Sequence, residues 1–507
     1  MPVGPSPRRD KPGCLHSLTR ASLRQRSREA HSPVSRMLKW HELLGDQLPE
    51  SAKARGKISM ADDNTHDAPM IASIPTLGKR HREKALKAFQ EVDGNIVPTF
   101  TELSNDFEHL LEDVHDSFPA LDVKAVDVER NGTNALLVTG GLGQHNSLIL
   151  VEDGQAKDVA GTYGLEGPLD QAAYSIAVGD IDNDGEDEIL IGMENGIYLY
   201  SRSPGSESYT EKRLDITLPE PDRVLPLGIA LADTRKSGNL DIYVSTFIKP
   251  KFMTPIVYND PAVSIDNAFY MNNGDGTFTE NTEAAGLTMH QNCFDATLTD
   301  FTGDGYPDVV VALNTDRPRM WGNNGDGTFT EKQLPGEYGF WMGLAVGDSN
   351  GNGLPDFFLA NSGKSVPARM AKGDLRPDQT QDLASRHFRN EGDYVFTDAT
   401  EESGTVTDAF AWGSIFADFT NNGRNDLVVT ENYLAYPMHL HEKFPTAGKF
   451  FLQGTDGKFV RAEHASGVSN YHFGYKPLAI DLTGSGYNDL VIGNLRGPLR
   501  IFLNELS

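Results

Sequence analysis

The most regular feature of the sequence is a pattern of apolar and polar positions that recurs after residue 120. In each copy, a short run of small and apolar residues leads to an aspartate and a polar turn with glycine. A run rich in β-branched and apolar residues follows. Short apolar runs on either side of a polar turn predict two β-strands joined by a loop. The seven copies are AVDVERNGTNALLV (125–138), AVGDIDNDGEDEILI (177–191), ALADTRKSGNLDIYV (230–244), TLTDFTGDGYPDVVV (297–311), AVGDSNGNGLPDFFL (345–359), IFADFTNNGRNDLVV (415–429) and AIDLTGSGYNDLVI (479–492).

A second pattern alternates with the first and predicts β-hairpins. Two apolar segments flank a centre of Asn, Gly and Asp residues, which tolerate the positive φ angles of tight turns. The clearest copies are FYMNNGDGTFTE (269–280), RMWGNNGDGTFTE (319–331), HFRNEGDYVFTD (387–398) and KFFLQGTDGKFV (449–460). One strand pair and one hairpin make a four-stranded unit, and radial repetition of such units predicts an all-β, seven-bladed β-propeller. A β-sandwich is the alternative, although sandwiches do not repeat a loop motif this regularly.

The ends of the repeat region predict how the ring closes. After the last aspartate loop the sequence has one further strand, LRIFLNELS at 499–507, which leaves the last unit one strand short. The segment NIVPTFTELS at 95–104 has the same Phe-Thr-Glu pattern as the hairpins. We therefore expect this N-terminal strand to complete the last blade, so that the propeller covers 93–507.

The segment before the propeller differs in composition. Residues 1–59 contain 12 Lys or Arg and 5 Asp or Glu, with many Ser and Pro residues and no periodic apolar spacing. This composition predicts a disordered basic leader over 1–75, followed by a short helix over 76–92. Three explanations of the leader stay open at this point: a transit-type presequence, a flexible basic tail, or translated upstream sequence with the true start at Met60.

Charge narrows the classes of partner. The 507 residues include 45 Lys or Arg and 72 Asp or Glu, for a net charge of −27. The part after residue 59 has 33 basic and 67 acidic residues, a net charge of −34, which argues against nucleic acid as a partner.

Only Cys14 and Cys293 occur, so a disulfide framework is not expected. Neither a secretory signal nor a membrane span is expected, and the compartment stays open.

The loop at 180–188 carries the strongest chemical signal. Its sequence, Asp-Ile-Asp-Asn-Asp-Gly-Glu-Asp-Glu, places carboxylates at the first, third, fifth and ninth positions and glycine at the sixth. Alternate residues of a tight loop can face one centre, and hard carboxylate oxygens suit Ca²⁺. We predict a calcium site whose ligands are the side chains of Asp180, Asp182, Asp184 and Glu188 and the carbonyl of Glu186.

Three further loops keep oxygen atoms at the same positions with fewer charges, and they predict weaker calcium sites. Their predicted ligands are Asp300, Thr302, Asp304 and Asp308; Asp348, Asn350, Asn352 and Asp356; and Asp418, Thr420, Asn422 and Asp426. In the loop from Asp233, the basic residues Arg235 and Lys236 predict an internal ion pair in place of a metal. The alternative for all of these loops is that their aspartates only cap the backbone amides of turns.

These repeats resemble a known family. The sequence DIDNDGEDEILIG resembles the FG-GAP/VCBS repeat of integrin-type propellers. The longer segments NNGDGTFTENTEAAGL (272–287) and FAWGSIFADFTNNGRNDLVVT (410–430) are similar to the ASPIC/UnbV and cartilage-acidic-protein group. The resemblance covers roughly 120–507 and implies a calcium-binding propeller. Such propellers serve in adhesion, in glycan binding and occasionally as lyases or dehydratases, so the resemblance fixes no single activity.

One face of the predicted ring is the candidate binding face. The long connections between second and third strands, at about 245–268, 361–386 and 431–448, fall on the face where the inner strands begin. Long loops on one face favour a binding site, and aromatic side chains with a few polar groups suit a small ligand or sugar. The candidate ligand-binding residues are Asp295, Trp341, Trp412, His472 and Tyr475.

Three functions remain open from the sequence. The first is binding of a glycan or a protein partner through this long-loop face. The second is a polysaccharide lyase or sugar dehydratase in the central funnel, with His472, Tyr475 or His439 as the acid or base. The third is a structural scaffold, because aromatic residues at strand entries also pack between blades. The known phosphate-loop and zinc-protease motifs do not occur in the sequence.

Overall fold

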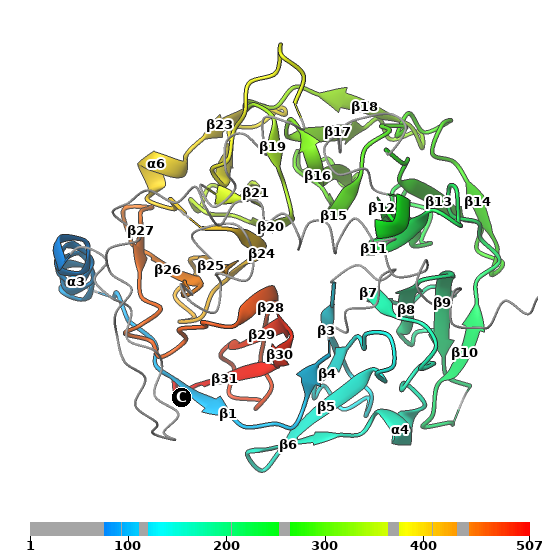
Figure 1. The fold of residues 1–507 in the computed structure, drawn as a ribbon, viewed down its shortest axis with the longest axis horizontal. Helices are drawn as coiled ribbons and strands as arrows, with labels where there is room; N and C mark the ends of the chain where they lie inside the picture. Colours follow the sequence, from blue (N-terminus) through cyan, green and yellow to red (C-terminus); the bar gives the residue numbers. More distant parts are fainter. Residues whose placement is uncertain are drawn as a thin grey trace, which may run out of the picture.

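The fold is that of a computed structural model, described for residues 76–92, 94–110, 120–203, 205–252, 264–363, 375–407, 409–432 and 446–506. The predicted basic leader at 1–75 lies outside these residues. Within the described ranges, seven sheets lie around a common centre like the blades of a propeller (Figure 1). The predicted all-β, seven-bladed fold is confirmed.

In six blades, four strands follow one another from the centre of the ring to its rim. Neighbouring strands run antiparallel, as short connections require. The strands of the first four blades are β3 (Val123–Val126), β4 (Ala135–Val138), β5 (Ser147–Glu152) and β6 (Gln155–Asp158); β7 (Ala173–Gly179), β8 (Glu188–Met193), β9 (Gly196–Ser201) and β10 (Thr210–Arg213); β11 (Val224–Ala232), β12 (Asp241–Ile248), β13 (Ala268–Asn272) and β14 (Phe278–Glu280); β15 (Cys293–Thr299), β16 (Asp308–Asp316), β17 (Arg319–Asn323) and β18 (Phe329–Lys332), with β19 (Gly339–Phe340) paired to β16.

The last three blades complete the ring. Their strands are β20 (Gly343–Gly347), β21 (Asp356–Ala360), β22 (Arg386–Asn390) and β23 (Phe396–Asp398); β24 (Ala411–Ala417), β25 (Asp426–Glu431), β26 (Lys449–Gln453) and β27 (Phe459–Arg461); and β28 (Phe473–Ile480), β29 (Asp489–Leu495), β31 (Arg500–Asn504) and β1 (Phe100–Leu103). The connections after β12, β21 and β25 are long, as predicted, and their middle parts lie outside the described residues.

The N-terminal strand closes the ring. β1 pairs antiparallel with β31, from Phe100 opposite Asn504 to Leu103 opposite Ile501. The Phe100 ring contacts Phe419 and Phe450 edge to face, at centroid distances of 6.0 and 5.9 Å. The predicted N-terminal closing strand is therefore confirmed, and it joins the two ends of the ring by non-covalent contacts alone.

Burial follows the position of a strand within its blade. The second strands β8 and β12 are buried along their whole length, because both faces pack against neighbouring blades. The rim strand β10 is exposed throughout. Most apolar clusters lie between adjacent blades, so each blade depends on its neighbours for its core.

Among the residues that the structure describes, few helices and strands lie outside the blades. Helix α3 (Thr76–Gln90) packs on β27 and belongs through Leu86 and Phe89 to the apolar cluster between the last two blades (Figure 1). The short strands β2 (Glu108–His109) and β30 (Gly497–Pro498) form a separate ribbon. The described ranges also contain the short helices α4 (Ala160–Tyr163) and α6 (Thr400–Ser403) and the 3-10 helix η1 (Pro250–Phe252). Across the described ranges, no helix combines the length and the apolar character needed to span a membrane.

Candidate functional site

The aspartate loops join the first strand of each blade to the second. In every loop the first aspartate accepts hydrogen bonds from the backbone N–H groups four and five residues further on. Asp180, for example, accepts from Asp184 at 3.1 Å and from Gly185 at 3.0 Å. The other capping residues are Asp127, Asp233, Asp300, Asp348, Asp418 and Asp481. This bonding shapes all seven loops in the same way, whatever their charge.

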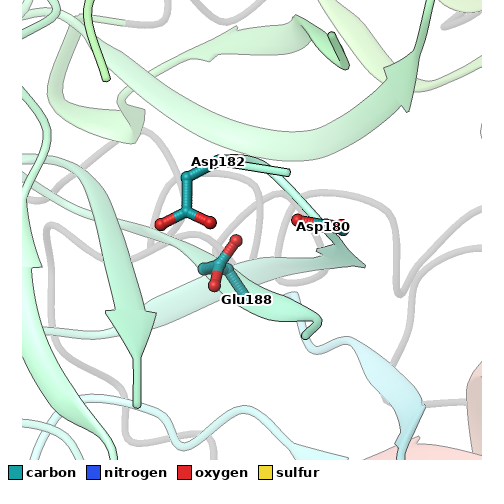
Figure 2. Close-up of side chains that lie close together, drawn as sticks. All are labelled: Asp180, Asp182 and Glu188. Atoms are coloured by element: carbon teal, nitrogen blue, oxygen red, sulfur yellow. The ribbon is translucent and has the colours of Figure 1, made fainter. Parts of the chain in front are cut away.

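The loop between β7 and β8 brings three acidic side chains together. Carboxylate oxygens of Asp180, Asp182 and Glu188 all lie within 4.8 Å of one another (Figure 2). Oxygens that each lie about 2.4 Å from one ion are at most about 5 Å apart, so this spacing fits Ca²⁺. Among the residues that the structure describes, this is the one such group of three acidic, histidine or cysteine ligands.

Glu188 is the buried member of this triad, with 3% of its surface exposed. Burial, together with the negative charges of Asp182 and Asp184, raises its pKa to about 7. The backbone N–H of Ile181 donates to the carboxylate at 2.8 Å and, with a smaller effect of the Asp182 backbone, acts in the opposite direction on the pKa. A buried carboxylate beside two others is costly without a cation, so the electrostatics of this loop favour a bound cation.

The two other predicted ligands of this loop are placed differently. The side chain of Glu186 points to Arg130 of the first blade and Arg202 of its own blade, which leaves only its carbonyl for the predicted role. Asp184 accepts a hydrogen bond from the backbone of Glu186 at 2.9 Å and is not part of the triad. Since Asp184 still raises the pKa of Glu188, it adds negative potential to the site.

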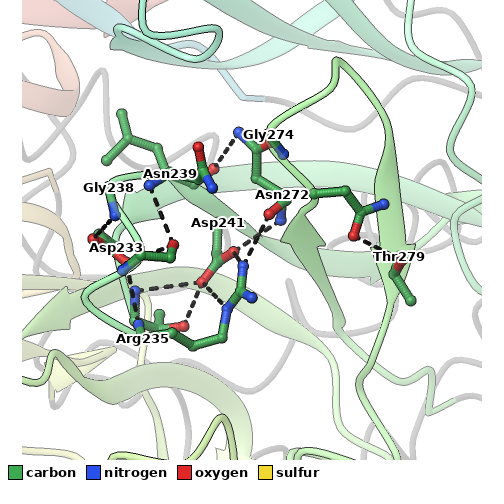
Figure 3. A network of polar contacts seen from close by, with 12 residues as sticks. Asp233, Arg235, Gly238, Asn239, Asp241, Asn272, Gly274 and Thr279 are labelled. Atoms are coloured by element: carbon green, nitrogen blue, oxygen red, sulfur yellow. Dashed lines mark hydrogen bonds and ion pairs between the residues drawn. The ribbon is translucent and has the colours of Figure 1, made fainter.

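The next loop, between β11 and β12, contains its own cation. Arg235 forms an ion pair with the buried Asp241 at 2.8 Å and donates to the carbonyl of Asn272 at 2.9 Å (Figure 3). Asp241 also accepts hydrogen bonds from Thr234. The predicted internal ion pair is confirmed for Arg235. Lys236 points away to the following blade, where it donates to the carbonyl of Asp304 at 2.7 Å.

Replacing this internal cation should destabilise the fold. In Arg235→Met, Asp241 keeps its other hydrogen bonds but loses its counter-charge in a buried position. We expect a loss of about 2 kcal/mol in the free energy of unfolding, measured by urea titration at pH 7. Arg389→Met is the matched control, because Arg389 is 30% exposed, against 28% for Arg235, and pairs with the exposed Glu391. A loss in Arg389→Met as large as in Arg235→Met would contradict this role for burial.

The three middle loops differ from the loop at 180–188 in how their last acid is bonded. Asp308, Asp356 and Asp426 are buried and accept N–H groups both from their own loop and from the third strand. Burial raises the pKa of Asp426 to about 7. The other candidate ligands hydrogen-bond within their loops: Asp300, Thr302 and Asp304; Asp348, Asn350 and Asn352; Asp418, Thr420 and Asn422. Calcium binding by these loops stays a prediction.

An amide link between blades is a feature that the sequence patterns did not reveal. The last residue of a third strand donates its side-chain amide to a backbone carbonyl in the aspartate loop of the preceding blade. Asn272 bonds the carbonyl of Ile181 at 2.9 Å, and Asn323 bonds that of Thr234 at 2.9 Å. Asn390, Gln453 and Asn504 repeat the contact. In four of these five blades the linking residue is an asparagine, which in three of them precedes a hairpin turn. This asparagine was the available signal, but asparagine also fits the turn itself.

At the start of the inner strands, aromatic side chains gather around Trp412. Its ring lies 5.1 to 6.3 Å from the rings of Phe294, Phe410, Phe473 and Tyr475. On the same strands, Lys476 donates to Asp295 at 2.7 Å and so connects the last blade to the fourth across the ring. Three of the five candidate ligand-binding residues, Asp295, Trp412 and Tyr475, thus lie on inner strands in or beside this group.

The other candidates lie elsewhere. Trp341 is fully buried in the cluster between the fourth and fifth blades, and its indole N–H donates to the carbonyl of Asp316 at 2.7 Å. His472 is exposed and lies beside Gly497 of the short ribbon. His439 lies outside the described residues. Burial raises the pKa of Tyr475 above its usual range, which opposes a role as a phenolate base.

Comparison with known proteins identifies the repeat. A model of the FG-GAP-like repeat matches residues 257–311 and 300–359, which include the aspartate loops of the fourth and fifth blades. No curated protein matches the chain.

Two solved structures are similar to this chain at low identity. The structure of an Agrocybe aegerita lectin that recognises non-reducing terminal N-acetylglucosamine is 18% identical over 76% of this chain and 95% of that one, with a TM-score of 0.38. The structure of BBS1N in complex with ARL6DN is 10% identical over 81% of this chain and 99% of that one, with a TM-score of 0.45.

Proposed function

We propose that this propeller of FG-GAP-like repeats is a calcium-stabilised binding protein. The observation that carries the calcium part is the triad of Asp180, Asp182 and Glu188, whose oxygens lie within 4.8 Å of one another. Bound calcium would supply positive charge to these carboxylates. The chain's own residues would hold it: the triad, with Asp184 adding negative potential and the Glu186 carbonyl as a further oxygen.

The contrast between neighbouring loops supports this proposal. In the loop from Asp233, a guanidinium neutralises the buried acid, and in the loop at 180–188 the equivalent acid, Glu188, faces two carboxylates. Arg130 and Arg202 lie near the loop at 180–188, but they pair with Glu186. The fold thus provides two versions of one loop, one with an internal cation and one whose ligands suit an external cation.

Calcium addition to the chelator-treated protein tests the proposal. Free Ca²⁺ at about 30 times its Kd should add about 2 kcal/mol to the free energy of unfolding, because the ion binds only the folded loop. Asp182→Asn keeps the side-chain acceptor but removes a charge, and we expect it to weaken binding at least tenfold by calorimetric titration. Asp275→Asn makes the same change at another exposed turn-capping aspartate and should bind calcium like the wild type. Melting curves that do not respond to calcium, with no heat of binding, would refute the proposal.

The same titration counts the sites. We infer that the loops at 300–308, 348–356 and 418–426 are weaker sites, because they keep oxygen ligands with fewer charges. If the wild type binds more than one ion, and if the additional ions still bind Asp182→Asn, these loops hold the additional ions. A stoichiometry of one would restrict calcium to the loop at 180–188.

We further propose that the partner is a glycan or a protein and that it binds the long-loop face. The support is the group of Trp412, Tyr475 and the Asp295–Lys476 pair at the start of the inner strands, since aromatic rings beside polar groups suit sugars and peptide side chains. Kinship with the ASPIC/UnbV and cartilage-acidic-protein group is part of this proposal.

A panel of glycans and uronates, measured with the wild type and with Trp412→Ala, tests whether the partner is a glycan. Turnover lost in His472→Ala would instead favour a sugar lyase or dehydratase.

A scaffold role is the second candidate, and the aromatic packing is the observation that favours it. Phe294, Phe410, Phe473 and Tyr475 are all at least nine-tenths buried, so little of their surface is offered to a ligand. If no member of the panel binds, and if Trp412→Ala lowers stability alone, the scaffold role is the better account of this face.

A further inference from the structure

The buried side chain of Asn272, at the end of β13, connects the third blade to the calcium loop of the second. Its amide nitrogen Nδ2 donates to the carbonyl of Ile181 at 2.9 Å and to that of Leu240 at 3.2 Å. Its Oδ1 accepts from the backbone of Gly274 at 2.9 Å, and its own N–H donates to Asp241 at 2.8 Å. Asn272 is therefore held in one orientation by its own blade, and Figure 3 shows this network.

The contact falls on the peptide that joins two positions of the triad loop. The carbonyl of Ile181 and the N–H of Asp182 belong to the same trans peptide, so they point in opposite directions. Asn272 binds the carbonyl from one side, and the N–H of Asp182, on the other side, helps to lower the pKa of Glu188. The preceding peptide carries the N–H of Ile181, which donates to Glu188 at 2.8 Å. Ile181 thus contacts Asn272 through its carbonyl and the buried Glu188 carboxylate through its N–H.

The geometry points to Asn272 as a positioning residue for the calcium site of the neighbouring blade. This inference rests on the proposed function. By fixing the Ile181–Asp182 peptide, Asn272 holds Glu188 within reach of Asp180 and Asp182 before an ion arrives. Residues that orient metal ligands typically change metal affinity 10- to 100-fold when replaced. The affinity of the loop at 180–188 therefore depends on a residue that lies 91 positions away from Ile181 in the sequence.

The repetition of the link provides a matched control. Asn323, at the end of β17, is buried and makes the same contact with Thr234, in the loop that contains Arg235 in place of the predicted metal. Its N–H also donates to Asp308, the last acid of the aspartate loop in its own blade, at 2.8 Å. Replacing Asn323 removes an equivalent set of hydrogen bonds but touches no residue of the triad. A general loss of stability should affect both variants, whereas a loss of calcium affinity should affect only the Asn272 variant.

The experiment compares calcium affinity in the two variants by calorimetric titration of the full-length protein. We expect Asn272→Ala to weaken calcium binding at least tenfold and Asn323→Ala to change it less than twofold. Asn272→Gln should restore much of the affinity, because Gln453 makes the same link between the fifth and sixth blades. Melting curves of the calcium-free variants show whether each one is folded. If either alanine variant does not fold, Asn272→Asp and Asn323→Asp replace the pair, since aspartate lacks the donor but keeps the acceptor.

The outcomes separate the two proposals. Wild-type calcium affinity in both the Asn272 and the Asn323 variant would overturn the positioning role and leave the calcium site intact. Equal loss in both variants would overturn it as well, because the effect would then be a general one. A wild-type protein that binds no calcium would refute the proposed function, and the positioning role with it.

Discussion

Deletion of residues 95–104 is expected to abolish the stable ring. The deleted segment contains β1, whose four residues pair with β31 and supply the outer strand of the last blade. Phe100 alone is 8% exposed and packs between Phe419 and Phe450, and truncation of such a buried phenylalanine costs about 3–5 kcal/mol. Together with the lost pairing, this cost is comparable to the total stability of a typical domain. We expect a large fall in melting temperature and association through the exposed edge of β31, measured by thermal unfolding and size-exclusion chromatography.

Two point variants separate ring closure from ordinary packing. Phe100 and Phe329 occupy equivalent outer-strand positions, each at the start of a Phe-Thr-Glu sequence, and are 8% and 5% exposed. Phe329→Ala removes a buried ring from a blade whose strands are consecutive in the chain, and Phe100→Ala removes one from the closing strand. We expect both to destabilise the protein and only Phe100→Ala to promote association. A deletion variant that melts like the wild type would show that β1 does not close the ring.

Acid is expected to destabilise the fifth blade through His387. This residue of β22 is 1% exposed, and its Nε2 and Nδ1 hydrogen-bond the hydroxyls of Ser349 at 2.7 Å and Ser403 at 3.1 Å. Burial, with a smaller effect of Arg389, lowers its pKa from 6.5 to about 4. Between these values the unfolded chain binds a proton that the folded protein does not, so stability falls as the pH falls. The loss reaches about 3 kcal/mol near pH 4.

The comparison with His387→Gln isolates this contribution. Glu188 and Asp426 have pKa values raised to about 7, and their contribution to stability changes with pH in the opposite direction. The pH dependence of the wild type alone therefore mixes the two effects. We expect the difference in unfolding free energy between wild type and His387→Gln to shrink by about 3 kcal/mol from pH 7 to pH 4, as measured by urea titration. A difference that stays constant would mean that His387 takes up a proton without unfolding.

Much of the candidate site followed from local sequence. The alternation of carboxylates with glycine at 180–188 predicted a loop whose acids converge, and the structure brings Asp180, Asp182 and Glu188 together. Arg235 predicted an internal cation, and it pairs with Asp241. These predictions needed only residues within one nine-residue loop, where the chain itself fixes the distances. For that reason spacing along the sequence was sufficient.

Contacts between blades could not be predicted in the same way. The sequence placed Trp341 and Trp412 at equivalent strand entries, but one lies between two blades and the other on an inner strand among aromatic rings. The choice depends on the shape of the neighbouring blade, which the residue's own strand does not encode. The same holds for the pair of Asp295 and Lys476, which lie 181 positions apart.

The sequence by itself determined the seven blades, the strand that closes them and the loop whose acids suit calcium. Its strand and turn patterns are local, and their repetition fixes the ring. Only the tertiary structure decided how the blades act on one another, as in the hydrogen bond from Asn272 to the loop of the preceding blade. An asparagine before a hairpin turn has the same local pattern whether its amide faces solvent or a neighbouring carbonyl. The difference arises only when packing of the blades brings that carbonyl within hydrogen-bond distance.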